Sequence, residues 1–440
     1  MRTFVLVWVC TFLSATAFAQ DWDFSGMAQI QGFYANQELP WWMYTNSSNT
    51  QNANTNGLGY AFAKAQTEYS NGVRLEAGVG LMYRDGFTDR FQRSELYLRF
   101  SNRWLKATLG SANPEIALDG LSSTNANVLW SGNNRAIPGL LLESPRPIPL
   151  WSIFSFEYAL GHYLLNDDRF VDNTQIHYKQ VAITAQLSAK SKVTGSLHHY
   201  AQWGGTHPEL RELPSGFGDF VKVVFAQSAG DNAEFNEQLN ALGNHLGAIN
   251  ARYQYDGTAG VFQAYHQHLF EDASGLGFVN FPDGVWGLSY APKASWIKRV
   301  LYEYVTTVDQ SKGAGRSAGD NYFSNKGYRS GWTYEGTTIG LPFIRLNPQT
   351  GLGISNNLIK AHHLGALFSW NSFDLSTKIS FVEDAGSPSN PLERPEEHIY
   401  SYLGLVYHTD YGDLRLDIGA DANSSSSDLF GIGLGYQYRF

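Results

Sequence analysis

The chain closes with Asp428-Leu-Phe-Gly-Ile-Gly-Leu-Gly-Tyr-Gln-Tyr-Arg-Phe440, in which apolar residues alternate with small or polar ones. Successive side chains of a β-strand point to opposite faces, so this segment has one apolar wall and one small or polar wall. A strand of a soluble sandwich could show the same alternation, but aromatic residues crowd the end of this strand. Aromatic girdles on strands that face lipid on one side and water on the other are typical of transmembrane β-barrels. The segment therefore predicts the closing strand of an outer-membrane barrel, and a terminal Phe440 also resembles the assembly signal of such barrels.

The start of the chain predicts export. Arg2 precedes an apolar run from Phe4 to Leu13, and Ala17-Phe-Ala19 supplies a small-x-small cleavage pattern. This pattern predicts a signal peptide over residues 1–19 and leaves 20–440 as the barrel domain. Cys10, the only cysteine, lies inside this leader, which excludes disulfides, cysteine metal sites and thiol catalysis in the mature chain. No later segment offers the roughly 18 uncharged apolar residues of a helical membrane span.

The rest of the chain alternates short turns with long loops. Turn signals lie at Asn71-Gly72, Asn102-Arg103, 145–149, 189–191, 256–258, Pro292-Lys293, Asn371-Ser372 and Asp410-Tyr411. Longer polar or glycine-rich stretches lie near 36–57, 85–89, 111–134, 163–175, 204–242, 269–283, 309–356, 383–397 and 422–427. Two strand-like runs separate consecutive turns. We therefore predict an all-β fold, a transmembrane antiparallel β-barrel of about 18 strands with long extracellular loops and both ends in the periplasm. A large soluble β-protein is the alternative architecture, and it would leave this short–long rhythm without a cause.

Composition agrees with a barrel. The chain is 15% aromatic and has 44 glycines, which suit interfacial girdles and small lumen-facing positions. Charged residues repeat on one strand face, and we expect Glu76, Arg84, Glu95 and Arg99 to form a charge lattice across a polar interior. A net charge of −9 argues against binding to nucleic acid.

The loops carry a family likeness. The longest one contains Asp320-Asn-Tyr-Phe-Ser-Asn-Lys-Gly-Tyr-Arg-Ser-Gly-Trp-Thr-Tyr334. Supporting stretches are Ser131-Gly-Asn-Asn-Arg-Ala-Ile-Pro138, Asp168-Arg169, Ile176-His-Tyr-Lys179, His198-His-Tyr-Ala-Gln-Trp-Gly-Gly205, Gly243-Asn-His-Leu-Gly247 and Gln267-His-Leu-Phe-Glu-Asp-Ala-Ser-Gly275. Together these motifs, from about residue 130 to 345, resemble the Wzi capsule-assembly family.

That resemblance implies an eighteen-stranded barrel in the bacterial outer membrane that binds capsular or extracellular polysaccharide as a surface lectin. The strand-like segment from Asp23 to Ala35 follows the leader almost directly. The periplasmic helical bundle known in that family is therefore not expected here.

Loop composition also favours glycan binding. Sugars present apolar C–H faces and fixed hydroxyls, so their sites combine flat aromatic rings with amides and carboxylates. The candidate glycan-binding residues are Trp41 and Trp42 before an asparagine-rich tract, Trp130 beside two asparagines, and Asp320, Asn321, Tyr322, Trp332 and Tyr334 in the longest loop. The structural alternative is that rim aromatics form the interfacial girdle and asparagine-rich loops merely turn.

Catalysis is not expected. Glycoside hydrolysis needs two carboxyl groups roughly 5–10 Å apart, whereas the neighbours Glu271 and Asp272, or Glu383 and Asp384, point to opposite strand faces. We predict a protein that is not an enzyme and has no cofactor.

Metal binding stays open for calcium. His266 and His268 share a strand face but have no identified third ligand. Calcium among loop carboxylates and carbonyls is left open, because hard cations need clustered oxygens.

The main functional alternative is a porin or sugar channel. Long loops without a structural role of their own are uncommon, so we expect them to plug or narrow the lumen. The predicted surroundings are outer-membrane lipids, and the predicted state is a monomer.

Overall fold

The computed structural model describes residues 21–228, 241–271, 273–293, 296–312 and 320–440. The predicted signal peptide, 1–19, lies outside the described residues. No helix in the described ranges is long and apolar enough to cross a membrane.

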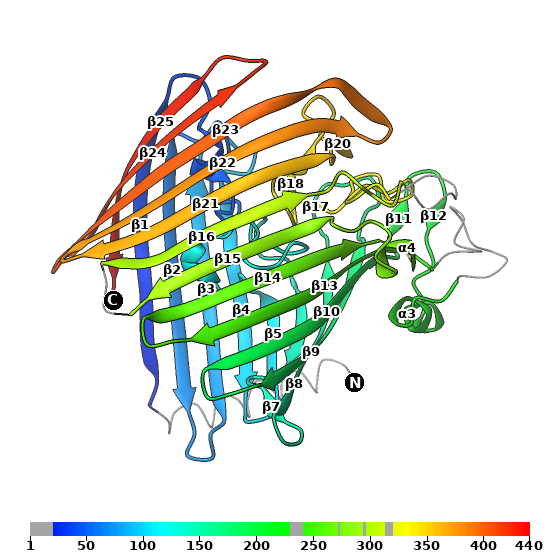
Figure 1. Ribbon diagram of the computed structural model, residues 1–440, viewed down its shortest axis with the longest axis horizontal. Coiled ribbons are helices and arrows are strands. Elements are labelled where there is room, and N and C mark those ends of the chain that lie inside the picture. Colours follow the sequence, from blue (N-terminus) through cyan, green and yellow to red (C-terminus); the bar gives the residue numbers. More distant parts are fainter. Residues whose placement is uncertain (1–20, 229–240, 272, 294–295, 313–319) are drawn as a thin grey trace, which may run out of the picture.

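Eighteen antiparallel strands close into a barrel (Figure 1). They are β1 Asp23–Ala35, β2 Gly57–Glu68, β3 Arg74–Arg84, β4 Phe91–Ser101, β5 Lys106–Ser111, β6 Gly139–Glu143 continued by β7 Ile148–Pro149, β8 Phe154–Leu164, β9 Gln175–Gln186, β10 Ser191–Trp203, β13 Asn244–Asp256, β14 Gly260–Phe270, β15 Gly284–Pro292, β16 Ile297–Thr306, β21 Ile359–Trp370, β22 Phe373–Ser387, β23 Asn390–Thr409, β24 Gly412–Asn423 and β25 Leu429–Arg439. The predicted fold class and strand number are confirmed.

The terminal segment is the closing strand. β25 pairs with β1 from Met27 opposite Arg439 to Ala35 opposite Gly431, and Phe440 N donates to Gly26 O at 3.1 Å. Closure of this kind gives every strand a partner on both sides, which a barrel in lipid requires.

Side chains on the barrel wall alternate as the sequence predicts. On β25, Leu434 is 64% exposed on the outer face. On the inner face, a side-chain carbon at Gly431 would lie 2.6 Å from Pro40 Cδ and 2.9 Å from Met43 Sδ. The absence of a side chain at Gly431 thus allows the loop after β1 to pack directly on the wall.

One predicted turn is wrong. The segment 145–149 interrupts a strand, because Pro145 and Pro147 have no N–H to continue the ladder. The chain resumes as β7 and turns at 150–153, where Leu150 N donates to Phe154 O at 3.0 Å.

One predicted loop is also wrong. The polar stretch 383–397 is a long hairpin in which Glu383 lies opposite Glu397 and Asp384 opposite Glu396. A bulge follows Asp384, and Gly386 takes a positive φ of 81°. Large apolar side chains exposed on the outer wall, such as Leu434, form an apolar belt that ends on these two strands at Phe381 and Ile399. The hairpin extends past those residues, so both of its faces can be polar, and polarity alone made it resemble a loop.

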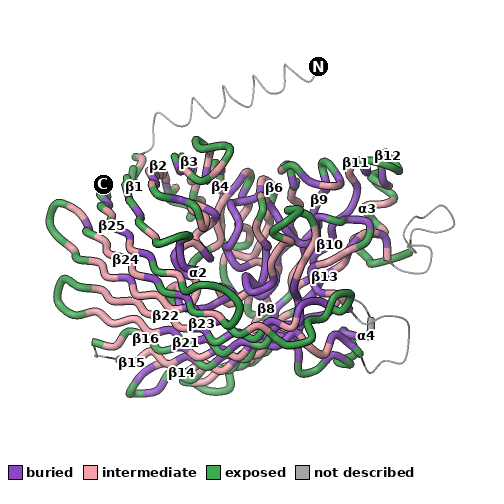
Figure 2. Tube along the Cα trace, turned by 90° about the horizontal axis from the view of Figure 1, so that it is seen from above, coloured by how far each residue is buried: buried purple, intermediate pink, exposed green. Residues whose placement is uncertain are grey.

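Smaller elements lie in the connections at the outer end. They are α2 Trp41–Tyr44, the 3-10 turn Leu118–Gly120, β11 Thr206–His207, β12 Arg211–Glu212, α3 Phe217–Val224, α4 Ala273–Leu276, β17 Thr333–Tyr334, β18 Thr337–Thr338, β19 Arg345–Leu346 and β20 Ile354–Asn356. Seen from above, buried segments fill the space enclosed by the strands (Figure 2). The core of this protein therefore lies inside the barrel.

Candidate functional site

Three outer loops fold into the lumen and form a plug, which we define as residues 36–56, 112–138 and the described parts of 307–358. Their apolar side chains join inward-facing wall residues in one buried cluster. Representative members are Trp41, Leu129 and Trp332 from the plug and Tyr200 and Val305 from the wall. The expectation of a plugged lumen is confirmed.

Glu303 fixes the second plug loop to the wall. This β16 carboxylate is fully buried and accepts from the Ser122 hydroxyl at 2.6 Å, the Ser123 hydroxyl at 2.6 Å and the Ser123 backbone N–H at 2.7 Å. Tyr265 on the neighbouring wall donates a fourth bond at 2.5 Å. Hydrogen bonds to a charged acceptor are the stronger ones, and a buried carboxylate is stable only when its oxygens are satisfied. The loop position is therefore strongly determined.

Trp332 and Tyr334 lie in the core of the plug. Both are 0% exposed. The Trp332 indole donates to Leu129 O at 2.7 Å, and its ring meets Tyr200 edge-on at 5.5 Å between centroids. Their side chains are committed to packing between two plug loops and the wall.

The segment that opens the same loop is equally well bonded. The Tyr322 hydroxyl contacts Asn280 at 2.6 Å and Asp283 at 3.1 Å. Asp320 accepts from Ser311 at 2.8 Å. Asn321 is only half-buried, so it keeps part of its surface accessible.

The first plug loop is anchored by its tryptophans. Trp41 stacks on Tyr400 at 5.2 Å, and the Trp42 indole donates to Ser380 at 3.0 Å. Both rings are buried. Trp130, in the second loop, is half-buried and lies 4.9 Å from the Tyr163 ring. Of the eight candidate residues, Asn321 and Trp130 are thus the most accessible.

The structure adds an arginine network that the sequence reading did not assign. Arg135 binds both carboxylate oxygens of Glu335, one of them through Nε at 2.8 Å. Arg84 lies 4.0 Å from the same carboxylate, and Arg169 pairs with Asp167 at 3.1 Å. Arg135 lies in the family-like stretch 131–138 and Arg169 in Asp168-Arg169. The family resemblance could therefore have pointed to both arginines as functional residues. Their partners are distant in sequence, so the pairing itself could not be read.

The Tyr334 hydroxyl lies between Arg135 and Asn166, the residue that precedes Asp167. It donates to Asn166 at 2.8 Å and accepts from Arg135 at 3.2 Å. Burial raises the pKa of the Tyr334 phenol to about 12. The phenol therefore stays neutral and remains a donor at physiological pH.

The predicted charge lattice is confirmed in part. Arg99 binds Glu76 at 2.7 Å across neighbouring wall strands. Glu95 instead accepts from the Asn113 backbone at 3.2 Å, and Arg84 turns to the plug. One of these contacts therefore joins two wall strands, and the other two join the wall to plug loops.

Glu383 and Asp384 point apart as predicted, whereas Asp272 of the other predicted pair, Glu271 and Asp272, lies outside the described residues. Glu383 pairs with Lys360 at 3.8 Å and Asp384 with Arg345 at 3.1 Å. Both carboxylates thus bind cations on different elements.

The histidine pair lies on the outer wall. His266 stacks on Trp286 at 3.7 Å, and His268 bonds Gly275 O at 2.9 Å. Within the described ranges, no group of three His, Cys, Asp or Glu side chains could hold a metal ion.

Comparison with known proteins gives a family and a fold. The family model for the capsule assembly protein Wzi matches residues 40–373. The structure of Escherichia coli Wzi, described as an outer-membrane protein involved in group 1 capsule assembly and a carbohydrate-binding β-barrel, is similar with a TM-score of 0.62. At 13% identity, the match covers 99% of this chain and 88% of that chain.

Other solved barrels are less similar. Pseudomonas aeruginosa OccK5 (OpdH) matches with a TM-score of 0.50 at 10% identity, over 95% of this chain and 98% of that chain. OpdO from the same organism gives 0.50 at 11% identity, over 95% and 97%. No curated protein matches the sequence. At these identities the structural matches establish the fold alone.

Proposed function

The chain belongs to the Wzi capsule-assembly family of outer-membrane barrels, and from this membership we propose that it is a surface lectin. It binds capsular or extracellular polysaccharide without changing it chemically, and it holds the polymer at the cell surface. The observation that carries this proposal is the family match over residues 40–373, which spans all but the first residues of the plug and most of the wall.

The filled lumen supports a binding role over a porin. A channel needs a continuous water path, whereas here plug side chains such as Trp332 and Tyr334 are fully buried between loop and wall. Buried segments of the chain also lie inside the ring of strands (Figure 2). We propose that the barrel acts as a monomer, since closure between β1 and β25 supplies each described wall strand with two partners.

We assign two roles to the eight candidate residues. Asn321 and Trp130 retain accessible surface and are the proposed contacts, one as an amide and one as an aromatic platform. Asp320 is 8% exposed and is proposed to join them at the edge of the site. The other five candidate residues are buried and are proposed to set the shape of the loops; they are Trp41, Trp42, Tyr322, Trp332 and Tyr334.

Weak contacts suffice for this function. A repeating polymer engages several sites or returns to one site repeatedly, so low affinity per sugar still holds a long chain. Arg93, a half-buried neighbour of the arginine network around Glu335, adds a cation that can bond glycan oxygens.

The test is binding of purified cell-surface polysaccharide to purified full-length protein in detergent. We expect wild type to bind and Asn321→Ala with Trp130→Ala to bind about tenfold more weakly, the effect of losing roughly 1.4 kcal/mol. Asn390→Ala, an exposed amide on the β22–β23 hairpin, is the matched control and should bind like wild type. Equal binding by all three proteins would overturn the site assignment, and no binding by wild type would overturn the lectin proposal.

A further inference from the structure

The helix α3 lies against the outer wall of the barrel (Figure 1). Its Phe220 ring meets His162 at 5.7 Å, His177 at 5.3 Å and Trp203 at 5.6 Å. Lys179 donates to the Val224 carbonyl. These wall residues come from β8, β9 and β10, close to the outer ends of those strands.

Strand parity shows that α3 covers the outer face. Side chains two positions apart on a strand share a face. Leu160 is two residues from His162, Val181 is two from Lys179, and both are exposed at 45% and 48%. They belong to the apolar belt, and α3 therefore lies directly beyond the outer edge of that belt.

The helix is apolar on both its sides. The helix begins at Phe217, and Asp219 in its first turn accepts from the Gly216 N–H at 3.1 Å, which caps its N-terminus. Phe220 and Val223 face the wall, and Val223 is 0% exposed. On the other side Phe217, Val221 and Phe225 recur every four residues and form one stripe. They are exposed at 83%, 37% and 68%.

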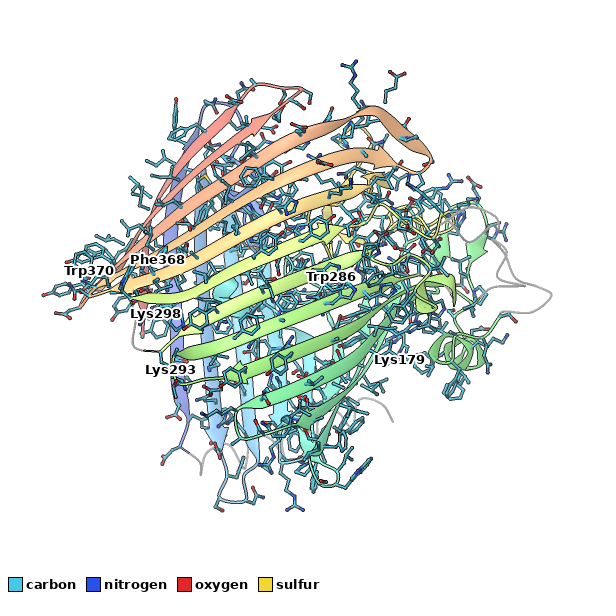
Figure 3. The ribbon with its side chains drawn as sticks, in the orientation of Figure 1. Lys179, Trp286, Lys293, Lys298, Phe368 and Trp370 are labelled. Carbon is cyan, nitrogen blue, oxygen red and sulfur yellow. The ribbon has the colours of Figure 1, made fainter. Side chains whose placement is uncertain are left out.

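A second apolar segment lies at the same end of the barrel. It runs from Leu276, the last residue of α4, to Phe281. Four of its side chains are exposed, those of Leu276, Phe278, Val279 and Phe281. Phe278 stacks on His268 at 4.4 Å, and Phe281 meets Trp286 at 5.7 Å. Figures 1 and 2 place α3 and α4 on one flank, and Figure 3 labels Lys179 and Trp286 on the wall strands that lead to them.

We propose that α3 and segment 276–281 form a lateral anchor that inserts into the outer leaflet of the outer membrane, where acyl chains meet the polar headgroups. Both apolar surfaces continue the lipid-facing belt, which is an established interface of any barrel in a membrane. A short helix that lies in the interface plane buries one apolar face among acyl chains. The polar ring beneath α3, formed by His162, His177, Lys179 and His199, lies where the surroundings change from acyl chain to headgroup. Apolar stripes this exposed are otherwise rare on protein surfaces.

The test places a fluorescent label on the proposed anchor. In a Cys10→Ser background the sequence contains no other cysteine, so Phe217→Cys carries a single label. Val181→Cys, on the lipid-facing wall, and Ser389→Cys, at the exposed tip of the β22–β23 hairpin, are the two references. Each full-length protein is reconstituted into phosphatidylcholine vesicles with acyl chains brominated near the headgroup, and iodide serves as the aqueous quencher.

The anchor predicts that brominated lipid quenches the label at position 217 with at least roughly half the fractional loss seen at position 181. The label at position 389 should respond to iodide alone. Quenching at position 217 by iodide alone, or by neither agent, would overturn the proposal. Phe225→Cys repeats the measurement at the other end of the stripe. If one of the two variants folds or labels poorly, the other still decides the outcome.

Discussion

Replacing Glu303 tests how the plug is held. Glu303→Leu removes the acceptor of four hydrogen bonds from Ser122, Ser123 and Tyr265. The three hydroxyls can rotate toward other acceptors, but the Ser123 backbone N–H is left buried and unsatisfied. We therefore expect a loss of about 3–5 kcal/mol, comparable with removing one partner of a buried ion pair. The wall keeps its backbone ladders, so the loss falls on the plug.

The assay is conductance of single proteins in planar lipid bilayers. Wild type should stay closed, and Glu303→Leu should show repeated open events as residues 112–138 leave the lumen. The matched control is Glu76→Gln, a lumen-wall carboxylate bound by Arg99 at 2.7 Å and by Tyr97 at 2.7 Å. It should remain closed. A Glu303→Leu protein as closed as wild type would refute the assignment of Glu303 as the plug anchor.

Two further changes probe the plug. Folding raises the pKa of Tyr334 from 10.0 to about 12. The neutral Tyr334 phenol therefore contributes its full stabilisation of the folded state below pH 10, and this contribution is lost as the pH rises through 12. Denaturant unfolding should show wild type losing about 2–3 kcal/mol more over that window than Tyr334→Phe, a variant that also lacks the bond to Asn166; equal pH profiles would contradict this reasoning. Gly431→Ala would bring a methyl group 2.6 Å from Pro40 Cδ and should cost about 1–3 kcal/mol in thermal unfolding. Gly195→Ala, which meets no described heavy atom within 4 Å, should change little, and equal stability of the two variants would count against the packing of the first loop on the wall.

Strand number and order were predictable because period-two alternation and turn residues are local signals. Asn71-Gly72 and Asp410-Tyr411 mark turns wherever they occur between apolar runs, and both turns are confirmed. The two errors have local causes as well. Pro145 and Pro147 read as a turn although they only interrupt a strand, and 383–397 read as a loop because a hairpin beyond the membrane needs no apolar face.

The interior of the plug was not predictable from one sequence. Glu303 bonds Ser122 across 181 positions of the chain, and Arg135 meets Glu335 across 200. Such contacts follow from how three loops pack together, and no local pattern encodes that. Burial of Trp332 is the clearest case, because an aromatic residue in a loop has the same sequence signature whether it faces glycan or packs in a core.

The central claim is retention of polysaccharide at the cell surface. It is tested most directly by measuring cell-attached against released polymer in a strain that lacks the gene, with and without the gene restored. We expect deletion to shift polymer from the cells to the medium, and restoring the wild-type chain to return it to the cells. Unchanged attachment after deletion, with polymer production intact, would contradict it.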